Sequence, residues 1–433
     1  MKIAILGYDI EGRSSFEYFA DQGHELTICD RNPAIKDRLP AGAESVLGEH
    51  YLDGLDRFDL LVRTAGLPPS LILEKNPGVG NKITSQINEF LKVCPTKNII
   101  GVTGTKGKGT TSTLISLMLQ ATGKSVRLGG NIGVPPLTFL SELKAESWVV
   151  LELSSFQLAD LKLSPHIAVC LMVVPEHLDW HTGIDEYTEA KSHLFAHQTP
   201  QDIAIYFAEN EASERIASTG DGRKIPYFAP PGAVIENSAV VIDGQTICQT
   251  GELKLIGRHN WQNVCAAVTA VWQTTRDVAA LRQVLTDFGG LEHRLQSVRE
   301  LNGVTYYDDS FGTAPETAMV AIEAFDKPVI AILGGRGKGI PFDGLAEFVA
   351  KRDIKHVIAI GETGQEITSL LRKNGYDRVT DGGSDIQKIA SLAQTLAEPG
   401  DVVLLSPACT SFDMFKNYKE RGELFTKAVQ ALA

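Results

Sequence analysis

Short apolar runs alternate with longer amphipathic stretches along almost the whole chain. Runs such as "KIAILG" (2–7), "WVVLELSS" (148–155) and "PVIAILGG" (328–335) are typical of strands buried in a parallel sheet, and the stretches between them are typical of helices. Strands that alternate with helices predict an α/β protein built from open, mostly parallel sheets.

The alternation falls into three sections, and a chain of 433 residues exceeds what one hydrophobic core usually supports. We predict a Rossmann-like domain over 1–95, which ends at the linker "PTKN", and a central domain of P-loop type over 96–295. The central domain includes a β-rich stretch near 203–250. A second Rossmann-like domain over 296–433 closes with a helix that we expect to begin near Ser411.

Composition narrows the range of partners. The net charge of -12 argues against nucleic acid, which needs a basic face. No run approaches 18 apolar residues, so we expect no membrane span, and the apolar run before Asp9 is too short for a signal peptide. The six cysteines are scattered without a C-x-x-C pair, which suits reduced thiols in the cytoplasm.

The stretch "GVTGTKGKGTTS" (101–112) follows a predicted strand and opens a predicted helix. It does not satisfy G-x-x-x-x-G-K-[ST], because Val102 and Gly109 occupy the first and last places. Its glycines still let backbone N–H groups turn inward, the helix N-terminus adds positive potential, and Lys108 would reach the outer phosphates. We therefore favour a phosphate loop over a glycine-rich turn without a ligand.

Two candidates for a metal site follow in the same section. Glu152 lies in an apolar strand, where a carboxylate is costly unless it is paired with a lysine or binds a metal. A phosphate loop needs Mg²⁺, which takes one or two carboxylates together with phosphate oxygens. Beyond the next strand, "PEHLDWHTGIDEYTEAKSHLF" gathers His177, Asp179, His181 and Lys191 in a spacing that is no recognised zinc pattern. By default, Lys191 would be a solvated surface lysine.

Other polar residues lie at strand ends. Arg294 and Asp309, near the second junction, could hold a nucleotide or form an interdomain ion pair. Lys338 belongs to a second glycine-rich basic turn, "LGGRGKG", and could bind a carboxylate. Ser411, at the expected start of the last helix, could bind an anion or simply cap the helix. Asp30 ends the second strand, in the place of the ribose-binding acid of dinucleotide folds, although "GYDIEGR" is not G-x-G-x-x-G.

Taken together, "GTKGKGT", "ELSSFQL", "EHLDWH", "GRHNWQN", "EHR", "LGGRGKG" and "SPACTSFDMFKNYKERG" resemble the Mur ligases, and the resemblance spans all three sections. It implies an ATP-dependent, amide-forming enzyme of peptidoglycan precursor synthesis that works through an acyl phosphate. The closing segment is similar to that of the members that add D-glutamate to UDP-N-acetylmuramoyl-L-alanine. The resemblance also implies small-molecule substrates only, and we expect a monomer.

The resemblance assigns roles to residues at the matching positions. It implies that the catalytic residues are Lys108, Glu152, His177 and Lys191. The implied ATP site is Gly104, Thr105, Lys106, Gly107, Lys108, Gly109, Thr110, Asn260, Asn263, Arg294 and Asp309. Mg²⁺, expected as two ions, would be held by Glu152, His177, a carbamylated Lys191 and Thr110. The UDP-muramoyl substrate would meet Asp30, Arg31, Asn131, Ser154 and Gln157, and the amino acid would meet Thr313, Lys338, Ser411 and Tyr418.

Three positions depart from the family pattern. Gly109 stands where a hydroxyl residue usually follows the loop lysine, so the hydroxyl that contacts magnesium stays open. Phe311 replaces the lysine of "DSKAT", and Glu176 replaces an aspartate. The loss of a positive charge at Phe311 keeps two alternatives in view: the same chemistry with L-glutamate or another amino acid, and a catalytically silent nucleotide-binding relative.

Overall fold

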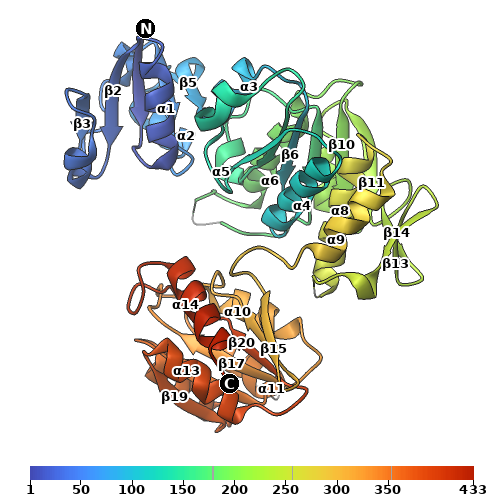
Figure 1. Cartoon of the computed structure of the whole chain (residues 1–433). Coiled ribbons are helices and arrows are strands. Elements are labelled where there is room, and N and C mark those ends of the chain that lie inside the picture. The colour runs from blue at the N-terminus through green and yellow to red at the C-terminus, as the bar shows by residue number, and fades with distance from the viewer. Residues whose placement is uncertain (178–179, 256, 353) are drawn as a thin grey trace. The chain divides into compact units, whose positions relative to one another are not determined.

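The computed structural model describes residues 1–177, 180–255, 257–352 and 354–433, and it confirms the α/β class (Figure 1). The chain forms two compact units. The first comprises Met1–Glu252 and His259–Thr286, and the second comprises Leu253–Arg258 and Asp287–Ala433. The first unit contains the sheets of both the first and the central predicted domain, so the boundaries at residues 95 and 295 stay predictions.

The N-terminal sheet of the first unit is parallel throughout and has the order β3-β2-β1-β4-β5. Asp9 caps α1 by accepting hydrogen bonds from the amides of Glu11 and Gly12, which fixes where the chain turns from strand into helix. The strands are β1 (Lys2–Leu6), β2 (Glu25–Asp30), β3 (Glu44–Leu47), β4 (Leu60–Arg63) and β5 (Ile83–Ser85). The helices are α1 (Ile10–Ala20), η1 (Pro33–Arg38), η2 (Leu55–Arg57), α2 (Pro69–Lys75), η3 (Gly80–Lys82) and α3 (Gln86–Val93).

The central sheet is also parallel, in the order β11-β10-β9-β6-β8-β7, and a small antiparallel sheet β12-β13-β14 follows it in the chain. The strands are β6 (Ile99–Thr103), β7 (Val126–Gly130), β8 (Trp148–Glu152), β9 (Ile167–Cys170), β10 (Ile203–Phe207), β11 (Arg223–Tyr227), β12 (Val234–Glu236), β13 (Ala239–Ile242) and β14 (Gln245–Gln249). The helices are α4 (Lys108–Ala121), η4 (Pro136–Glu142), α5 (Ser155–Leu158), α6 (Ile184–Ala196), α7 (Glu211–Ala217), η5 (Thr250–Glu252), α8 (Arg258–Trp272) and α9 (Val278–Asp287).

Strand β6 marks the point where the order of the central sheet changes direction. The next strands along the chain, β7 and β8, lie on one side of β6, and β9, β10 and β11 lie on the other. In open α/β sheets, ligands bind outside the carboxyl ends of the strands at such a point. The loop that leaves β6 is the glycine-rich stretch singled out in the sequence.

The sheet of the second unit has the order β15-β16-β20-β17-β18-β19 and is parallel except for the β15–β16 pair. Its strands are β15 (Gln296–Leu301), β16 (Val304–Asp308), β17 (Val329–Gly334), β18 (His356–Ile360), β19 (Val379–Gly383) and β20 (Val402–Leu405). Its helices are α10 (Pro315–Glu323), α11 (Asp343–Arg352), α12 (Gly364–Lys373), α13 (Ile386–Leu396) and α14 (Tyr418–Gln430).

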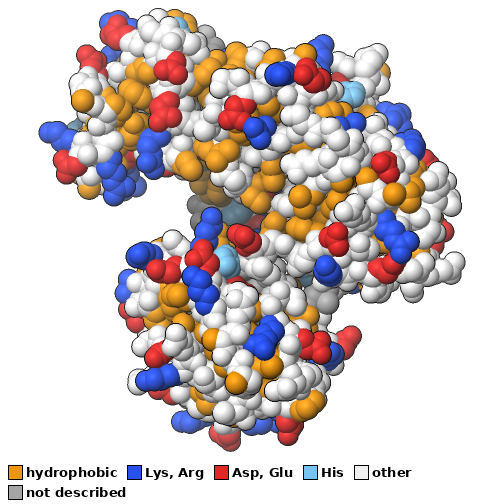
Figure 2. Space-filling model, viewed as in Figure 1, with side chains coloured by type: hydrophobic (Ala, Val, Ile, Leu, Met, Phe, Trp, Pro, Cys, Tyr) orange, Lys and Arg blue, Asp and Glu red, His pale blue; other side chains and the backbone are white. Residues whose placement is uncertain are grey.

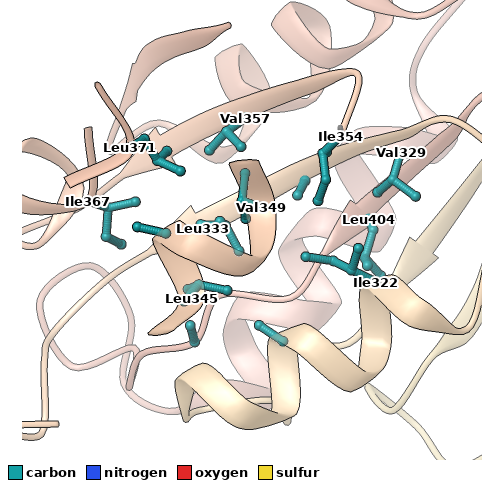
Figure 3. Packing of buried hydrophobic residues seen from close by; sticks show 14 of the residues in the cluster. Ile322, Val329, Leu333, Leu345, Val349, Ile354, Val357, Ile367, Leu371 and Leu404 are labelled. Atoms are coloured by element: carbon teal, nitrogen blue, oxygen red, sulfur yellow. The ribbon is translucent and has the colours of Figure 1, made fainter. Parts of the chain in front are cut away.

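Both faces of this sheet are buried, which explains its continuous apolar strands. Leu333, Val357 and Leu404 belong to the cluster on one face, which also takes in Ile322 of α10 and Val349 of α11 (Figure 3). Their strand neighbours belong to the cluster on the other face, because successive side chains point to opposite sides of a strand. The strands of a sheet that is covered on both faces are continuous apolar runs in the sequence, without alternation of apolar and polar residues.

The structure corrects one predicted helix boundary. Helix α14 begins at Tyr418 with Asn417 as its N-cap, and the Asn417 side chain accepts a hydrogen bond from the amide of Glu420. Ser411 therefore lies in the connecting segment and neither caps this helix nor offers an anion its N-terminus.

The surface agrees with the composition. Lys, Arg, Asp and Glu side chains are intermingled over the face drawn in Figure 2, without one large basic area. Within the described ranges, none of the helices combines the length and the apolar character that a membrane crossing requires.

Candidate active site

The loop between β6 and α4 is shaped by two glycines with left-handed backbone angles. Gly104 has φ 143° and Gly107 has φ 87°. A Cβ atom built on Gly107 would lie 2.1 Å from Oδ1 of Asn263, and one on Gly104 would lie 2.6 Å from Cβ of Leu171. The loop can therefore lie against α8 and the end of β9 only because both positions lack a side chain.

The N-terminus of α4 faces this loop. Gly107 is the N-cap residue and has no side chain with which to cap the first turn. Nζ of Lys108 turns back onto the loop, 3.1 Å from the carbonyl oxygen of Gly104 and 3.0 Å from that of Thr105. Uncapped amides at a helix start, with a lysine beside them, form an arrangement suited to a phosphate. Thr110, in the first turn of the helix, is buried.

Lys191 lies beneath the same loop and is 1% exposed, so the default expectation of a surface lysine is wrong. Its Nζ donates to the carbonyl oxygen of Gly104 at 3.1 Å and lies 4.4 Å from the ring centre of Tyr187. Burial, together with the nearby charge of Lys108, lowers the pKa of Lys191 to about 7. The Tyr187 hydroxyl lies 2.8 Å from Oγ1 of Thr105, which ties α6 to the loop.

Glu152 ends β8, the neighbour of β6, and is 5% exposed. Its Oε1 accepts a hydrogen bond of 2.6 Å from Nδ2 of Asn131, so its partner is an amide rather than the lysine that the sequence left as an alternative. The backbone amide of Asn131 also donates to the carbonyl oxygen of Glu152 at 2.8 Å. A Cβ on Gly130 would lie 2.2 Å from that carbonyl oxygen, which is why "GGNIG" can approach the strand so closely.

Ser154 and Gln157 form a capping box around the short helix α5. Oε1 of Gln157 accepts from the backbone amide of Ser154 at 3.1 Å, and its Nε2 donates to Oε1 of Glu11 at 2.7 Å. Ser154 and Gln157, which were predicted to contact the UDP-muramoyl substrate, thus also stabilise the fold of their own segment. The contact between Gln157 and Glu11 was not predicted, because a single acidic residue in the first turn of a helix carries no signal of a long-range partner.

The histidine-rich segment contributes two different environments. His177 has a left-handed backbone (φ 58°), and its ring lies 4.9 Å from that of Phe156. Its Nε2 lies 3.6 Å from Oε2 of Glu176, and Oε1 of Glu176 pairs with Nζ of Lys106 at 2.5 Å. His181 is buried with Nε2 3.0 Å from Oγ of Ser155, a packing role.

Asp179 lies outside the described residues. Among those that are described, the histidine, cysteine and carboxylate side chains nowhere gather in threes as a ready-made metal cage.

Asp30, at the end of β2, binds two backbone amides. Its Oδ2 accepts from Tyr8 and its Oδ1 from Asn32, each at 2.7 Å. The carboxylate therefore orders the loop after β1, and the exposed Arg31 lies next to it along the chain. Both residues lie at the carboxyl end of the N-terminal sheet, the edge where α/β sheets bind ligands.

The residues predicted for ATP divide between the two units. Asn263 donates to Oδ1 of Asn260 at 3.0 Å in the first unit. In the second unit, the guanidinium of Arg294 lies 4.3 Å from the ring centre of Phe311. Asp309 accepts hydrogen bonds from Oγ of Ser406 at 2.7 Å and from the amide of Leu295 at 3.1 Å, and burial raises its pKa to about 7.

The four residues predicted for the amino acid all belong to the second unit. Nζ of Lys338 donates to Oγ1 of Thr313 at 2.8 Å. The ring of Phe311 stands edge-on to that of Tyr418 at 5.2 Å. Ser411 is buried, and its carbonyl oxygen accepts from the amide of Phe415 at 2.7 Å. These four residues lie on the loops after β16, β17 and β20 and at the first position of α14.

The parallel sheets and the glycine-rich loop that opens a helix define an α/β protein of the P-loop type, and two family profiles match it. The Mur ligase middle domain matches residues 102–271, and the Mur ligase glutamate ligase domain matches residues 293–409. A UDP-N-acetylmuramoylalanine–D-glutamate ligase from Symbiobacterium thermophilum is 38% identical over 451 residues, covering 100% of this chain and 98% of the relative. One from Clostridium tetani is 36% identical over 448 residues, covering 100% and 97%.

Solved structures agree in fold. A MurF ligase from Thermotoga maritima in complex with ADP has a TM-score of 0.62 at 18% identity and covers 100% of this chain and 95% of its own. A UDP-N-acetylmuramate–alanine ligase, MurC, from Thermotoga maritima has a TM-score of 0.58 at 17% identity, covering 100% and 99%. The chain belongs to the Mur ligase family, whose members are ATP-dependent ligases.

Proposed function

We propose that this enzyme adds D-glutamate to UDP-N-acetylmuramoyl-L-alanine at the expense of ATP. The observation that carries the proposal is identity of 38% and 36%, over the whole chain, to relatives named for that reaction. The uncapped start of α4 beside Lys108 supports the ATP side of the proposal. The hydrogen bond between Lys338 and Thr313, which joins two loops of the second unit, supports a separate amino-acid side.

The chemistry joins two anions before it makes the amide. A carboxylate oxygen of the muramoyl-alanine substrate attacks the γ-phosphorus of ATP, so that ADP leaves and an acyl phosphate forms. The amino group of glutamate then attacks the acyl carbon, and inorganic phosphate leaves with the bonding electron pair. Lys108 and the α4 amides would stabilise the charge on the transferred phosphate, which is the main task of a protein in phosphoryl transfer.

We propose Mg²⁺ as the cofactor, as two ions, with Glu152, His177, Thr110 and Lys191 as its protein contacts. Mg²⁺ keeps several waters and takes few protein ligands when it binds with a nucleotide. The proposed protein ligands fit this coordination, because Glu152 is a buried carboxylate whose Oε1 is oriented by Asn131. Bound there, the ion would supply positive charge to the phosphates.

Lys191 suits this site only in modified form, since an ammonium repels Mg²⁺. A pKa of about 7 leaves a large fraction of the amine neutral near neutral pH, and a neutral amine can add carbon dioxide to form a carbamate. A carbamate offers oxygen atoms in place of the ammonium. We therefore propose a carbamylated Lys191. The test is to incubate the protein with labelled bicarbonate, trap the carbamate chemically, and measure the added mass by intact-protein mass spectrometry.

The remaining contacts complete the proposal. Asp30, Arg31, Asn131, Ser154 and Gln157 would orient the UDP-muramoyl substrate, and Thr313, Lys338, Ser411 and Tyr418 would orient the amino acid. Asn260, Asn263, Arg294 and Asp309 would complete the ATP site together with the loop residues Gly104–Thr110. We further propose a cytoplasmic protein, because all six cysteines are free and five of them are buried, as in a reducing compartment. We also propose that the protein is a monomer.

Phosphate release tests the proposed reaction. The purified protein is mixed with ATP, Mg²⁺ and UDP-N-acetylmuramoyl-L-alanine, and a panel of amino acids that includes both glutamate enantiomers is added one by one. We expect release with D-glutamate well above the control without amino acid. Release only with another amino acid would favour the second candidate, which the aromatic Phe311 in place of a lysine suggests. ATP binding without release for any acceptor would indicate a silent relative.

A further inference from the structure

The second unit contains a charged side chain that none of the proposed contacts uses. Arg421, in the first turn of α14, is 0% exposed. Within the described part of the chain, its hydrogen bonds all go to carbonyl and hydroxyl oxygens, and no carboxylate forms an ion pair with it. A guanidinium is costly to bury in this way, and hydrogen bonds from its several donors to neighbouring groups offset that cost.

The donors of Arg421 reach two separate loops. Nε donates to Oγ of Ser310 at 2.8 Å, and Nη2 donates to the carbonyl oxygen of Ser310 at 2.8 Å. Nη2 also reaches the carbonyl oxygen of Cys409 at 3.1 Å, and Nη1 reaches that of Thr410 at 3.2 Å. One planar fork thus joins the loop after β16 to the loop after β20.

A third loop is attached through Thr410. The backbone of Thr410 exchanges two hydrogen bonds of 3.0 Å with Arg336, in the glycine-rich turn after β17. Gly335 leaves no spare room there, because a Cβ atom on it would lie 2.4 Å from the carbonyl oxygen of Thr410 and 3.4 Å from Nη1 of Arg421. The loops after β16, β17 and β20 therefore meet around this guanidinium.

These loops carry the residues proposed for the amino acid. Thr313 follows Ser310, Lys338 follows Arg336, and Ser411 follows Thr410 along the chain. Tyr418 is linked as well, because Oγ of Ser310 donates to its carbonyl oxygen at 2.7 Å. We infer that Arg421 is the positioning residue of the amino-acid site: it contacts no substrate itself and sets the relative placement of the side chains that do. This inference rests on the proposed function for the identity of the ligand.

The experiment compares conservative substitutions of two arginines, Arg421 on α14 and Arg299 on β15. Arg421→Lys keeps the charge but removes the fork that reaches both loops. Arg299→Lys is the matched control, because within the described residues the hydrogen bonds of Arg299 go to main-chain carbonyls at the end of α14 and just beyond it, those of Val429, Gln430 and Leu432, away from the three loops. Ser310→Ala is a milder second variant, which removes one acceptor of Arg421 and the link to Tyr418.

For Arg421→Lys we expect the KM for the amino acid to rise roughly 10- to 100-fold, since a displacement of about 1 Å at a reacting group can cost on the order of 100-fold. The KM for ATP should stay within about twofold of wild type for the same variant, and Ser310→Ala should shift the amino-acid KM in the same direction by less. A similar rise for Arg299→Lys, or a rise in both KM values for Arg421→Lys, would reduce Arg421 to a general stabilising role and overturn the inference.

Hydrogen exchange keeps this test separate from the proposed reaction. The amino-acid KM is measured with whichever acceptor the wild type uses, so a different acceptor refutes D-glutamate and not the role of Arg421. Should the wild type release no phosphate with any acceptor, exchange of the backbone amides decides. Faster exchange in all three loops for Arg421→Lys, but not for Arg299→Lys, supports the inference. Unchanged exchange contradicts it.

Discussion

Two loops of this enzyme look alike as sequence and differ as structures. Both "GTKGKGT" after β6 and "GGRGKG" after β17 combine glycines with lysines at the carboxyl end of a central parallel strand. The first runs directly into α4 at Lys108, so helix amides and a lysine meet at one place. The second remains exposed from Arg336 to Ile340, and the next helix begins only at Asp343.

A glycine-rich basic loop binds phosphate best when a helix begins within it. A helix that starts within the loop supplies several aligned N–H groups, whereas a loop without one offers mainly its side chains. Lys108 bonds to carbonyls of its own loop, while Lys338 reaches across to Thr313 on another loop. We therefore expect the first loop to bind a polyanion and the second to hold the ammonium group of Lys338 in place.

Removal of the lysine of the first loop should have the largest effect on activity. Lys108→Met should lower kcat/KM for ATP by about 100- to 1,000-fold, because one preorganised cationic donor of this kind is worth that much in the transition state. The melting temperature should change little. Lys124→Met, just beyond the other end of α4, is the control and should keep nearly full activity. Phosphate release measures both, and a loss below about tenfold for Lys108→Met would argue against its contact with phosphate.

Glycine substitutions separate shape from charge. Gly107→Ala combines a left-handed backbone with a Cβ 2.1 Å from Oδ1 of Asn263, so we expect a destabilisation of roughly 2–4 kcal/mol and weaker ATP binding. Gly339→Ala has the same kind of backbone (φ 75°) but nothing within 4 Å of the new Cβ, and should cost only about 1 kcal/mol. Urea unfolding compares them, and equal costs would mean that α8 does not press on the first loop.

Removal of the second lysine should affect a different substrate. Lys338→Met should raise the KM for the amino acid about 10- to 100-fold, since hydrogen bonds to charged groups are worth roughly 1.5–3 kcal/mol. The KM for ATP should not change. Arg336→Met in the same turn is the control, because Arg336 pairs with Glu362 instead, at 2.7 Å and 3.1 Å. If Lys338→Met changed the ATP value instead, the two loops would not have separate roles.

Local patterns were enough to predict the fold and the positions of both loops. Apolar runs predicted most strands, but four escaped notice: β5 is only three residues long, β3 and β15 are largely half-exposed or exposed, and β7 is interrupted by an arginine and two glycines. The burial of Lys191 and the contacts of Arg421 could not be predicted, because both depend on residues brought near only by folding. The misplaced start of α14 has a local cause instead, because no apolar period marks residues 411–417 as a separate connection.

The smallest expected effect concerns the buried carboxyl of Asp309 in the second unit, whose pKa burial raises to about 7 from its ordinary 3.8. The folded state then holds the proton more tightly than the unfolded state, so this group lowers stability increasingly as the pH rises from about 4 to about 7.

Asp309→Asn keeps the shape and removes that cost. Its melting temperature, relative to wild type, should therefore gain a few degrees more at pH 8 than at pH 5, for roughly 1–2 kcal/mol of relieved penalty. Asp385→Asn, at the exposed N-cap of α13, is the control substitution. A gain for Asp309→Asn that is the same at both values would mean that Asp309 is already ionised at pH 5 in the folded protein, held so by Arg294 and Ser406 rather than neutralised by burial.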